Sequence, residues 1–453
     1  MAFDNRDSLD LGSMEIHRLF RKIFLPTLLG MIFNVAFVLT DGIFIGHGVG
    51  PDGLASVNLV SPVMMIITGI GMMFGIGGSV VAAIHLSNNN TKAARINTTQ
   101  AMVAAFVFAI LFSAVLYAAP ELSLKWLGTS PHLMCMAKEY LLWFVPTCVF
   151  IMIQIVGEFA IRLDGSPKYA MFCAIVPALL NMLLDYVFII RMGWGLMGAA
   201  FATDLGTGMG AAMTLWYFLG PSKTLRFYSL KFSATSMRLF LRNVGYMMKV
   251  GFSGFIGEFS LSVMALCGNL AFGKYLGDMG IAAFCVICYL FPIVCNILYA
   301  VSSSAQPIIS FNYGAKQTKR VRDTLFYGMS IAVMFSLTVT LAMWWLAPEV
   351  ISVFIEKGTE SFGYAVFGLP LFALGFVPNG FNSLAIGYLQ SVEANRNSTL
   401  LMSLKGIFLP IVLFKVLPML WGETGLWIAI PLAELSTAVF SILLLRKTSF
   451  RKE

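Results

Sequence analysis

The sequence predicts an all-α polytopic membrane protein with twelve transmembrane helices. Of its 453 residues, 58% are hydrophobic and only 11% are charged, whereas about 25% of the residues of an average soluble domain are charged. The apolar residues gather in twelve blocks that are long enough to cross a hydrocarbon core about 30 Å thick. Basic residues concentrate in alternate connections between those blocks, as they do in membrane proteins. These observations exclude a water-soluble fold.

The predicted spans follow one another with short polar connections. Each holds roughly 20 residues or more, which is what a transmembrane helix needs. The first block is long for a cleaved signal peptide, so we expect it to be the first span. The spans cover residues 22–46, 54–84, 98–120, 138–160, 169–190, 195–219, 245–272, 280–311, 324–346, 362–390, 398–418 and 425–446.

The distribution of Lys and Arg predicts the orientation of the chain. If the amino terminus is cytoplasmic, 23 of the 30 basic residues lie inside and 5 outside, while Lys405 and Lys415 fall within the eleventh span. Cytoplasmic loops carry such an excess. We therefore expect a multi-pass protein of the cell inner membrane with both termini in the cytoplasm. The net charge of +8 reflects this placement and not nucleic-acid binding.

An internal repeat divides the chain into two halves. A shift of 227 residues aligns Gly46, Gly50 and Gly53 with Gly273, Gly277 and Gly280, Thr91, Lys92 and Arg95 with Thr318, Lys319 and Arg322, and Gly195, Gly198 and Ala202 with Gly422, Gly425 and Ala429. Six spans per repeat give both halves the same orientation, as in transporters with parallel repeats. We predict an N-terminal six-helix bundle (1–219), a basic cytoplasmic linker (220–244) and a pseudo-symmetric C-terminal six-helix bundle (245–453).

The sequence favours secondary transport over transport driven by ATP. It contains no phosphate-binding loop of the G-x-x-x-x-G-K-[ST] type. Secondary transport needs an ionisable group within the membrane, where such a group is costly and is a functional candidate by default. The acids within the predicted spans are Asp41, Glu158, Asp185, Asp204, Glu258 and Glu434.

Three spans of the first half bring polar residues to one depth. Asp41 and Asp185 each lie five residues from the outer ends of their spans, and Thr203 and Asp204 lie eight or nine residues from the outer start of theirs. Asn181 precedes Asp185 by four residues, so the two share one helix face. We predict that these five residues form an ion-coupling cluster. A structural hydrogen bond between Asn181 and Asp204 is the alternative for that pair.

The cluster suits a proton or a sodium ion. Two carboxylates in a dry environment resist joint ionisation, so they can take up a proton from outside and release it inside. The same oxygens, together with the Asn181 amide and the Thr203 hydroxyl, are hard ligands that suit sodium, and the sequence leaves both ions open. At the 227-residue offset, the two aspartates of this set align with Gly268 and Val412. We therefore expect coupling in the first half only.

The other three acids within the spans, Glu434, Glu258 and Glu158, have structural or functional interpretations. Glu434 either forms a structural ion pair with Lys405 or contacts the substrate. Glu258 has no obvious basic partner, which favours a cavity-facing role. Glu158 lies one turn before Arg162, and we expect a surface bridge between them.

The expected substrate cavity is lined by flexible and aromatic side chains. Polarisable methionines and aromatic faces suit organic cations of varied shape, although packing or lipid contact is the alternative for them. Pro26 removes a backbone hydrogen bond from the first span and is the expected hinge, with a static kink as the alternative. The predicted cavity residues are Met31, Asn34, Phe37, Met64, Gln154, Glu258 and Met264.

An integral membrane enzyme is disfavoured. The histidines have no metal-like spacing, and no nucleophile and base stand out. No cofactor is expected apart from a sodium ion, if sodium is the coupling ion. That ion would be held by Asp41, Asn181, Asp185 and Thr203.

Several motifs resemble those of the multidrug and toxic compound extrusion (MATE) family. They are QPIISFNYGA from Gln306 to Ala315, DGSPKYA from Asp164 to Ala170, and Pro26 with Asp41. The likeness covers all twelve spans. It implies a V-shaped pair of six-helix bundles that exports cationic amphiphilic drugs in exchange for protons or sodium. In the DinF-like branch it also implies an ion site in the first bundle, which falls here on Asp41, Asn181, Asp185 and Thr203.

The resemblance has one departure and leaves one alternative. NorM-like members carry an aspartate in the tenth helix, whereas residues 362–390 contain no acid, which argues against a cation site in the second bundle. The alternative is a lipid-linked saccharide flippase of the same superfamily, and such proteins typically have more spans and a basic cavity. We expect a monomer whose partners are organic cations, protons or sodium, and the lipid bilayer.

Overall fold

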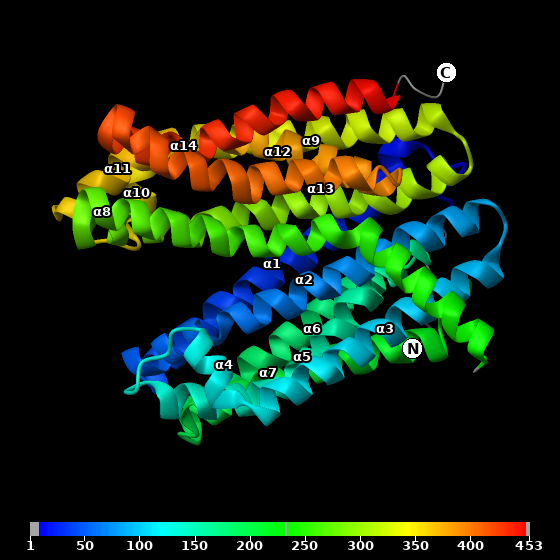
Figure 1. Ribbon diagram of the computed structural model, residues 1–453, viewed down its shortest axis with the longest axis horizontal. Coiled ribbons are helices and arrows are strands. Elements are labelled where there is room, and N and C mark those ends of the chain that lie inside the picture. Colours follow the sequence, from blue (N-terminus) through cyan, green and yellow to red (C-terminus); the bar gives the residue numbers. More distant parts are fainter. Residues whose placement is uncertain (1–8, 232, 450–453) are drawn as a thin grey trace. The chain divides into compact units, whose positions relative to one another are not determined.

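The computed structural model describes residues 9–231 and 233–449, and over these residues it contains helices and no strand (Figure 1). The two chain termini, which the sequence predicts to be cytoplasmic, lie outside the described residues. The described chain divides into two compact units. The first unit contains the residues up to Phe255 and the segment Ser310–Lys316, and the second contains Ile256–Ile309 and the residues from Gln317 onward.

The first unit is built from the helices of the first half and the start of a long helix that enters the second. Within it, α1 packs against α6, α6 against α7, and α5 against both α2 and α7. The elements are α1 (Ile16–Gly48), α2 (Pro51–Ser87), α3 (Thr91–Ala118), α4 (Pro120–Trp126), α5 (Met134–Leu163), α6 (Pro167–Asp185), the π-helical turn η1 (Tyr186–Arg191) and α7 (Gly195–Leu219).

The second unit contains most of α8 and all later elements. Within it, α12 packs against α9 and α14. The elements are α8 (Ala234–Gly314), α9 (Thr318–Trp345), α10 (Ala347–Ser352), α11 (Glu360–Ala373), α12 (Phe376–Ser391), α13 (Asn395–Ser403), the π-helical turn η2 (Leu404–Phe408) and α14 (Leu409–Ser449). Because α8 begins at Ala234, part of the segment predicted as a linker is helical.

The twelve predicted spans are present, but several are joined end to end. Eight helices are long and apolar enough to cross a membrane, and α11 and α12 form a ninth span bent by 45°. Two of the eight are each two spans, because α8 is kinked at Gly277 and α14 at Trp421 and Gly422. The remaining span is α7, which has 25 residues. A helix of that length is about 38 Å long at 1.5 Å per residue.

The backbone repeats at the offset found in the sequence. Gly50 and its equivalent Gly277 both have a positive φ, of 97° and 63°, and each separates two antiparallel spans. Asn89 and its equivalent Lys316 share a φ of 58° just before the repeated Thr-Lys pair. Glycine reaches positive φ without the steric cost that other residues meet. The two halves are therefore pseudo-symmetric in structure as well as in sequence.

Glycines allow α2 and the start of α8 to touch backbone to backbone within the first unit. A Cβ atom on Gly77 would collide with the Met247 carbonyl oxygen, and one on Gly251 would collide with that of Met73. In a membrane, small residues let helices approach closely, and van der Waals packing then replaces the missing hydrophobic driving force. This crossing attaches the start of α8 to the first unit.

The loop after α5 holds the chain that leaves α7. The Asp164 carboxylate accepts hydrogen bonds from the Tyr217 hydroxyl at 2.6 Å, the Ser222 hydroxyl at 3.0 Å, and the backbone N–H groups of Thr224 at 3.1 Å and Leu225 at 2.8 Å. Charged acceptors make hydrogen bonds about twice as strong as neutral ones. Asp164 therefore fixes where the connection to α8 begins.

Candidate functional site

Asp41 and Asp185 lie side by side inside the first unit. Asp41 belongs to α1 and Asp185 is the last residue of α6, and their carboxyl groups are within hydrogen-bond reach of each other. Asp185 is fully buried. Among the described residues, no donor reaches Asp41 Oδ1 or either carboxylate oxygen of Asp185. Two carboxylates cannot hydrogen-bond to each other without a proton, so this pair is a strong attractor for a positive ion.

Asn181 lies one turn before Asp185 on α6 and contacts Thr203 of α7. The Asn181 amide Nδ2 donates to the Thr203 hydroxyl at 3.3 Å, and that hydroxyl donates to the Ala199 carbonyl oxygen at 3.0 Å. The Asn181 Oδ1 atom is buried, and no donor in the described part of the chain reaches it. The lack of a side chain on Gly206 lets α7 come this close to α6. A Cβ at that position would lie 3.0 Å from both the Asn181 Cβ and the Pro177 carbonyl oxygen. Glycine is thus needed at this helix contact.

Asp204 does not make the hydrogen bond to Asn181 that the sequence analysis left as an alternative. The Thr147 hydroxyl of α5 donates to Asp204 Oδ1, while Asn181 donates to Thr203. Neighbouring helical residues point about 100° apart, since there are 3.6 residues per turn. Asp204 is 7% exposed and faces α5, so the two residues turn toward different helices.

Tyr140 lies near the aspartates of the candidate site, and the sequence did not reveal it. It lies in α5, its side chain is 5% exposed, and it is within electrostatic range of Asp41, Asp185 and Asp204. A phenol can donate a hydrogen bond to a carboxylate or accept one from its protonated form. The only sequence signal was its position, since it lies in the outer part of its span at the depth of the aspartates. An aromatic residue in an apolar span is too common for that signal to be specific.

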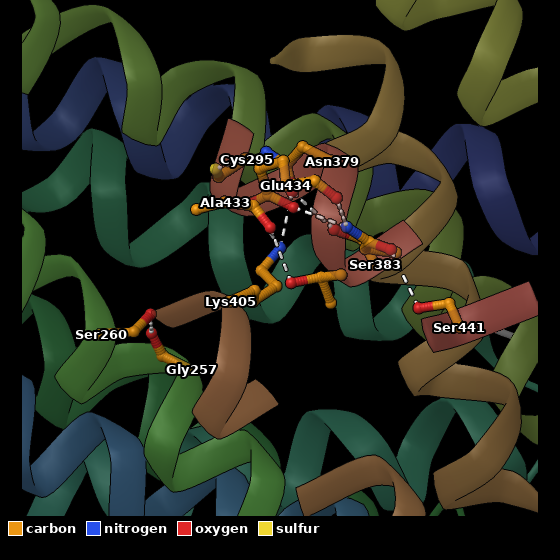
Figure 2. Close-up of polar contacts among 11 residues, drawn as sticks. Gly257, Ser260, Cys295, Asn379, Ser383, Lys405, Ala433, Glu434 and Ser441 are labelled. Carbon is orange, nitrogen blue, oxygen red and sulfur yellow. Dashed lines mark hydrogen bonds and ion pairs between the residues drawn. The ribbon is translucent and has the colours of Figure 1, made fainter. Parts of the chain in front are cut away.

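The second unit holds a buried ion pair, as one of the two readings of Glu434 and Lys405 predicted. The Lys405 ammonium lies 3.1 Å from Glu434 Oε1 and 2.7 Å from Asn379 Oδ1. The Asn382 amide donates to Glu434 Oε2 at 2.8 Å, and the Ser441 hydroxyl donates to Asn382 Oδ1 at 2.9 Å. Figure 2 shows the side chains of Lys405, Asn379 and Glu434 converging from η2, α12 and α14. The neutral amides of α12 that support the pair were not predicted.

The expected bridge between Glu158 and Arg162 is not a surface feature. Arg162 is 4% exposed, and its Nε donates to the Glu158 carbonyl oxygen at 3.1 Å. Its guanidinium lies over the Phe159 ring at 4.7 Å. The Glu158 carboxylate accepts a hydrogen bond from Gln154 at 3.2 Å. The prediction of an exposed pair was wrong because other helices cover the end of α5.

The residues predicted to line a cavity differ in exposure. Met264 is buried, Asn34 is exposed, and Met31, Phe37, Met64, Gln154 and Glu258 are half-buried. Gln154 also donates to the Cys173 carbonyl oxygen at 2.9 Å, which fixes its amide inside the first unit. Pro26 is buried within an uninterrupted α1. The cavity and the hinge therefore remain predictions.

No set of three or more His, Cys, Asp or Glu side chains in the described residues is placed to hold a metal ion. The oxygen cluster of the first unit is of another type, with two carboxylates, an amide and a hydroxyl. Such a donor set fits a hard monovalent ion or a proton.

The chain resembles known proteins over most of its length. The MatE family model matches residues 26–187 and 253–413. The chain is 22% identical over 419 residues to the multidrug export protein MepA of Staphylococcus saprophyticus, covering 92% of this chain and 91% of that protein. It is 23% identical over 412 residues to MepA of Staphylococcus haemolyticus, covering 90% and 89%.

Solved structures share the fold over nearly the whole chain. An outward-facing multidrug resistance MATE transporter of the MOP superfamily superposes with a TM-score of 0.90 at 20% identity, covering 99% of both chains. A MOP superfamily transporter from Pyrococcus furiosus, described as having a binding pocket of reverse polarity, superposes with a TM-score of 0.89 at 20% identity, covering 99% of both. With the family model matching most of its length, this chain belongs to the MATE family of multi-pass membrane transporters.

Proposed function

We propose that this protein is a secondary active multidrug efflux transporter of the cell inner membrane, with both termini in the cytoplasm. It exports cationic amphiphilic compounds by antiport with protons or sodium. The coupling ion binds at Asp41, Asn181, Asp185 and Thr203, and Asp204 of α7 tunes the same region. The observation that carries the proposal is the pair of aspartates: Asp185 is buried, and no described donor reaches Asp41 Oδ1 or either carboxylate oxygen of Asp185.

The energy of the pair is large enough to drive a conformational change. Removing an ionised carboxylate from water costs several kcal/mol, and a second carboxylate beside it adds repulsion. A bound positive ion offsets most of this cost, so the occupied and empty states differ by several kcal/mol. About 5.5 kcal/mol moves a two-state equilibrium from 1:99 to 99:1, and the membrane potential adds about 2.3 kcal/mol per charge for each 100 mV.

Both candidate ions have ligands at this site. A proton would be shared by the Asp41 and Asp185 carboxyl groups, which lie within hydrogen-bond reach of each other. A sodium ion would draw on the same two groups and on the oxygens of Asn181 and Thr203. The Asn181 Oδ1 atom is buried and available for this purpose. The two ions therefore compete for one set of oxygens.

The substrate class is supported by the relatives and by the side chains of the spans. The staphylococcal relatives are named multidrug export proteins. The chain has 27 methionines and 39 phenylalanines, which offer adaptable and cation-binding surfaces. Glu258 of α8 is half-buried and is the acid best suited to attract a cationic compound to the second unit.

Asp41→Asn tests the coupling role, because it keeps the shape of the side chain and removes its charge. In proteoliposomes with an imposed proton or sodium gradient, we expect ethidium export by the variant to fall at least about tenfold, which corresponds to a loss of about 1.4 kcal/mol. Comparing the two gradients separately in the unmodified protein identifies the ion.

Asp323→Asn is the matched control, since Asp323 is an exposed acid at the start of α9. It should export at the normal rate. Normal export by Asp41→Asn would remove the aspartate pair from the mechanism. Transport of a lipid-linked saccharide without any drug export would favour the flippase alternative.

A further inference from the structure

In the second unit, the Lys405 ammonium group is surrounded by oxygen atoms, as a bound free cation would be. The Lys405 side chain is 12% exposed and that of Glu434 is 4% exposed. The ammonium contacts a carboxylate oxygen at 3.1 Å and the Asn379 amide oxygen at 2.7 Å. The Ser383 hydroxyl donates to the same Asn379 oxygen at 3.1 Å. A compact positive charge thus sits among oxygens in a dry part of the unit.

The Asp41–Asp185 pair and Glu434 differ in whether hydrogen-bond donors or cations of the chain reach their carboxylate oxygens. In the first unit, no described donor reaches the Asp185 carboxylate oxygens. In the second, Glu434 Oε1 meets Lys405, and Oε2 accepts from Asn382. At the 227-residue offset, Lys405 aligns with Ala178, so the equivalent position in the first half carries no ammonium group. One site is left for a free ion, and the other is already filled by the chain.

The local backbone conformation positions the Lys405 side chain. Lys405 lies in the π-helical turn η2, which interrupts the helix between α13 and α14. Such turns are rare and often occur at functional sites. The next residue, Gly406, packs against Ser260 of α8 so closely that a Cβ there would collide with the Ser260 Cβ. The extra residue of the turn rotates the chain, and the glycine contact fixes that rotation.

We propose that Lys405 is a tethered cation that occupies a monovalent-cation site formed by Glu434 and Asn379, and so keeps the second unit from exchanging ions. This inference rests on the proposed function, since it explains why coupling is confined to the first unit. The distances of 2.7 and 3.1 Å suit an ammonium or a potassium ion better than the smaller sodium ion. Removing the lysine should therefore create a site that binds potassium more strongly than sodium.

The test measures thermal unfolding of the purified full-length protein in detergent. Every variant carries Asp41→Asn, which disables the site of the first unit. Unfolding is compared in KCl, NaCl and choline chloride at equal ionic strength. We expect Lys405→Met to lower the melting temperature in choline and to recover a few degrees in KCl and less in NaCl, because ligands that bind only the folded state stabilise it.

Two variants serve as controls. Adding Glu434→Gln to Lys405→Met should abolish the recovery, because the carboxylate ligand is gone. Lys415→Met changes a lysine that is exposed on α14, and it should show the same melting temperature as the Asp41→Asn parent in all three salts. A recovery in KCl that survives Glu434→Gln would contradict the proposed ligand set.

Each remaining outcome also decides the question. If the Lys405→Met protein can be purified in folded form in KCl or NaCl but not in choline chloride, the result supports the role of Lys405 as a tethered cation. If it melts at the same temperature in all three salts, or is unfolded in all of them, Lys405 is an ordinary structural lysine. Because this readout involves no transport, it stands even if the drug-export assay of Asp41→Asn contradicts the proposed function.

Discussion

Asn181 and Asp185 of the first unit have more hydrogen-bond acceptor atoms than there are donors that reach them. Asn181 turns its amide nitrogen to Thr203 and leaves Oδ1 buried, and Asp185 presents two oxygens that no described donor reaches. Leaving a buried acceptor unsatisfied costs about 1–3 kcal/mol, and more for a charged group. A bound positive ion would relieve this cost. The unsatisfied acceptors therefore support the proposed ion site.

Tyr140 provides the residue-scale prediction. Its hydroxyl is within electrostatic range of Asp41, Asp185 and Asp204. A hydrogen bond to a charged group contributes about 1.5–3 kcal/mol, so Tyr140→Phe should slow ion-driven ethidium export about tenfold or more without loss of folded protein. The measurement is the initial export rate in proteoliposomes at saturating gradient.

The control is Tyr364→Phe, which removes an exposed hydroxyl that donates to Glu360 at 2.7 Å. That variant should export at the normal rate. If Tyr140→Phe does the same, the phenol is a packing residue only, and the ion site consists of the polar groups of α1, α6 and α7.

At the scale of elements, several of the polar residues described above lie where a helix departs from regular α-helical geometry. α6 ends at Asp185 and continues as the π-helical turn η1, and Lys405 lies in the π-helical turn η2. α11 and α12 are bent by 45° one turn before Asn379. An irregular turn lets a side chain leave the face that the helical period assigns to it. Asp185 and Lys405 both lie at such irregularities, whereas Asp41 lies within the regular helix α1.

Gly277 gives the prediction for an element. Its φ of 63° and ψ of −157° lie in a region that is essentially open to glycine alone, and forcing another residue there costs about 1–3 kcal/mol. Gly277→Ala should therefore lower the melting temperature of the detergent-purified protein. The internal repeat implies a similar loss for Gly50→Ala, because Gly50 has a φ of 97°.

Gly245→Ala is a control on the same helix. A Cβ there would meet nothing within 4 Å, and alanine is favoured over glycine inside a helix by roughly 0.5–1 kcal/mol. Its melting temperature should stay the same or rise. Equal losses at positions 245 and 277 would show that the kink in α8 needs no glycine.

For the whole molecule, composition and the repeat were enough to predict the fold, because a membrane demands long apolar helices and the two halves share one pattern. Asp41, Asn181 and Asp185 could be grouped because depth and one-turn spacing follow from helical geometry. Tyr140, Thr147 and the amides of α12 could not be, since such residues occur throughout membrane helices and only tertiary packing gives them a partner. The kinks at Gly277 and Gly422 were likewise hidden.

The predicted orientation of the whole chain can be tested by labelling single cysteines in intact cells. The positive-inside rule places the start of α9 in the cytoplasm and the loop before α11 outside. In a variant lacking the seven native cysteines, Lys357→Cys should react with a membrane-impermeant maleimide. Lys319→Cys should react only after the cells are permeabilised. Both lysines are exposed, so access to the reagent and not burial decides the result. The reverse pattern would place both termini outside the cell, and the aspartate pair would then load its ion from the cytoplasm, which is incompatible with export driven by an inward ion gradient.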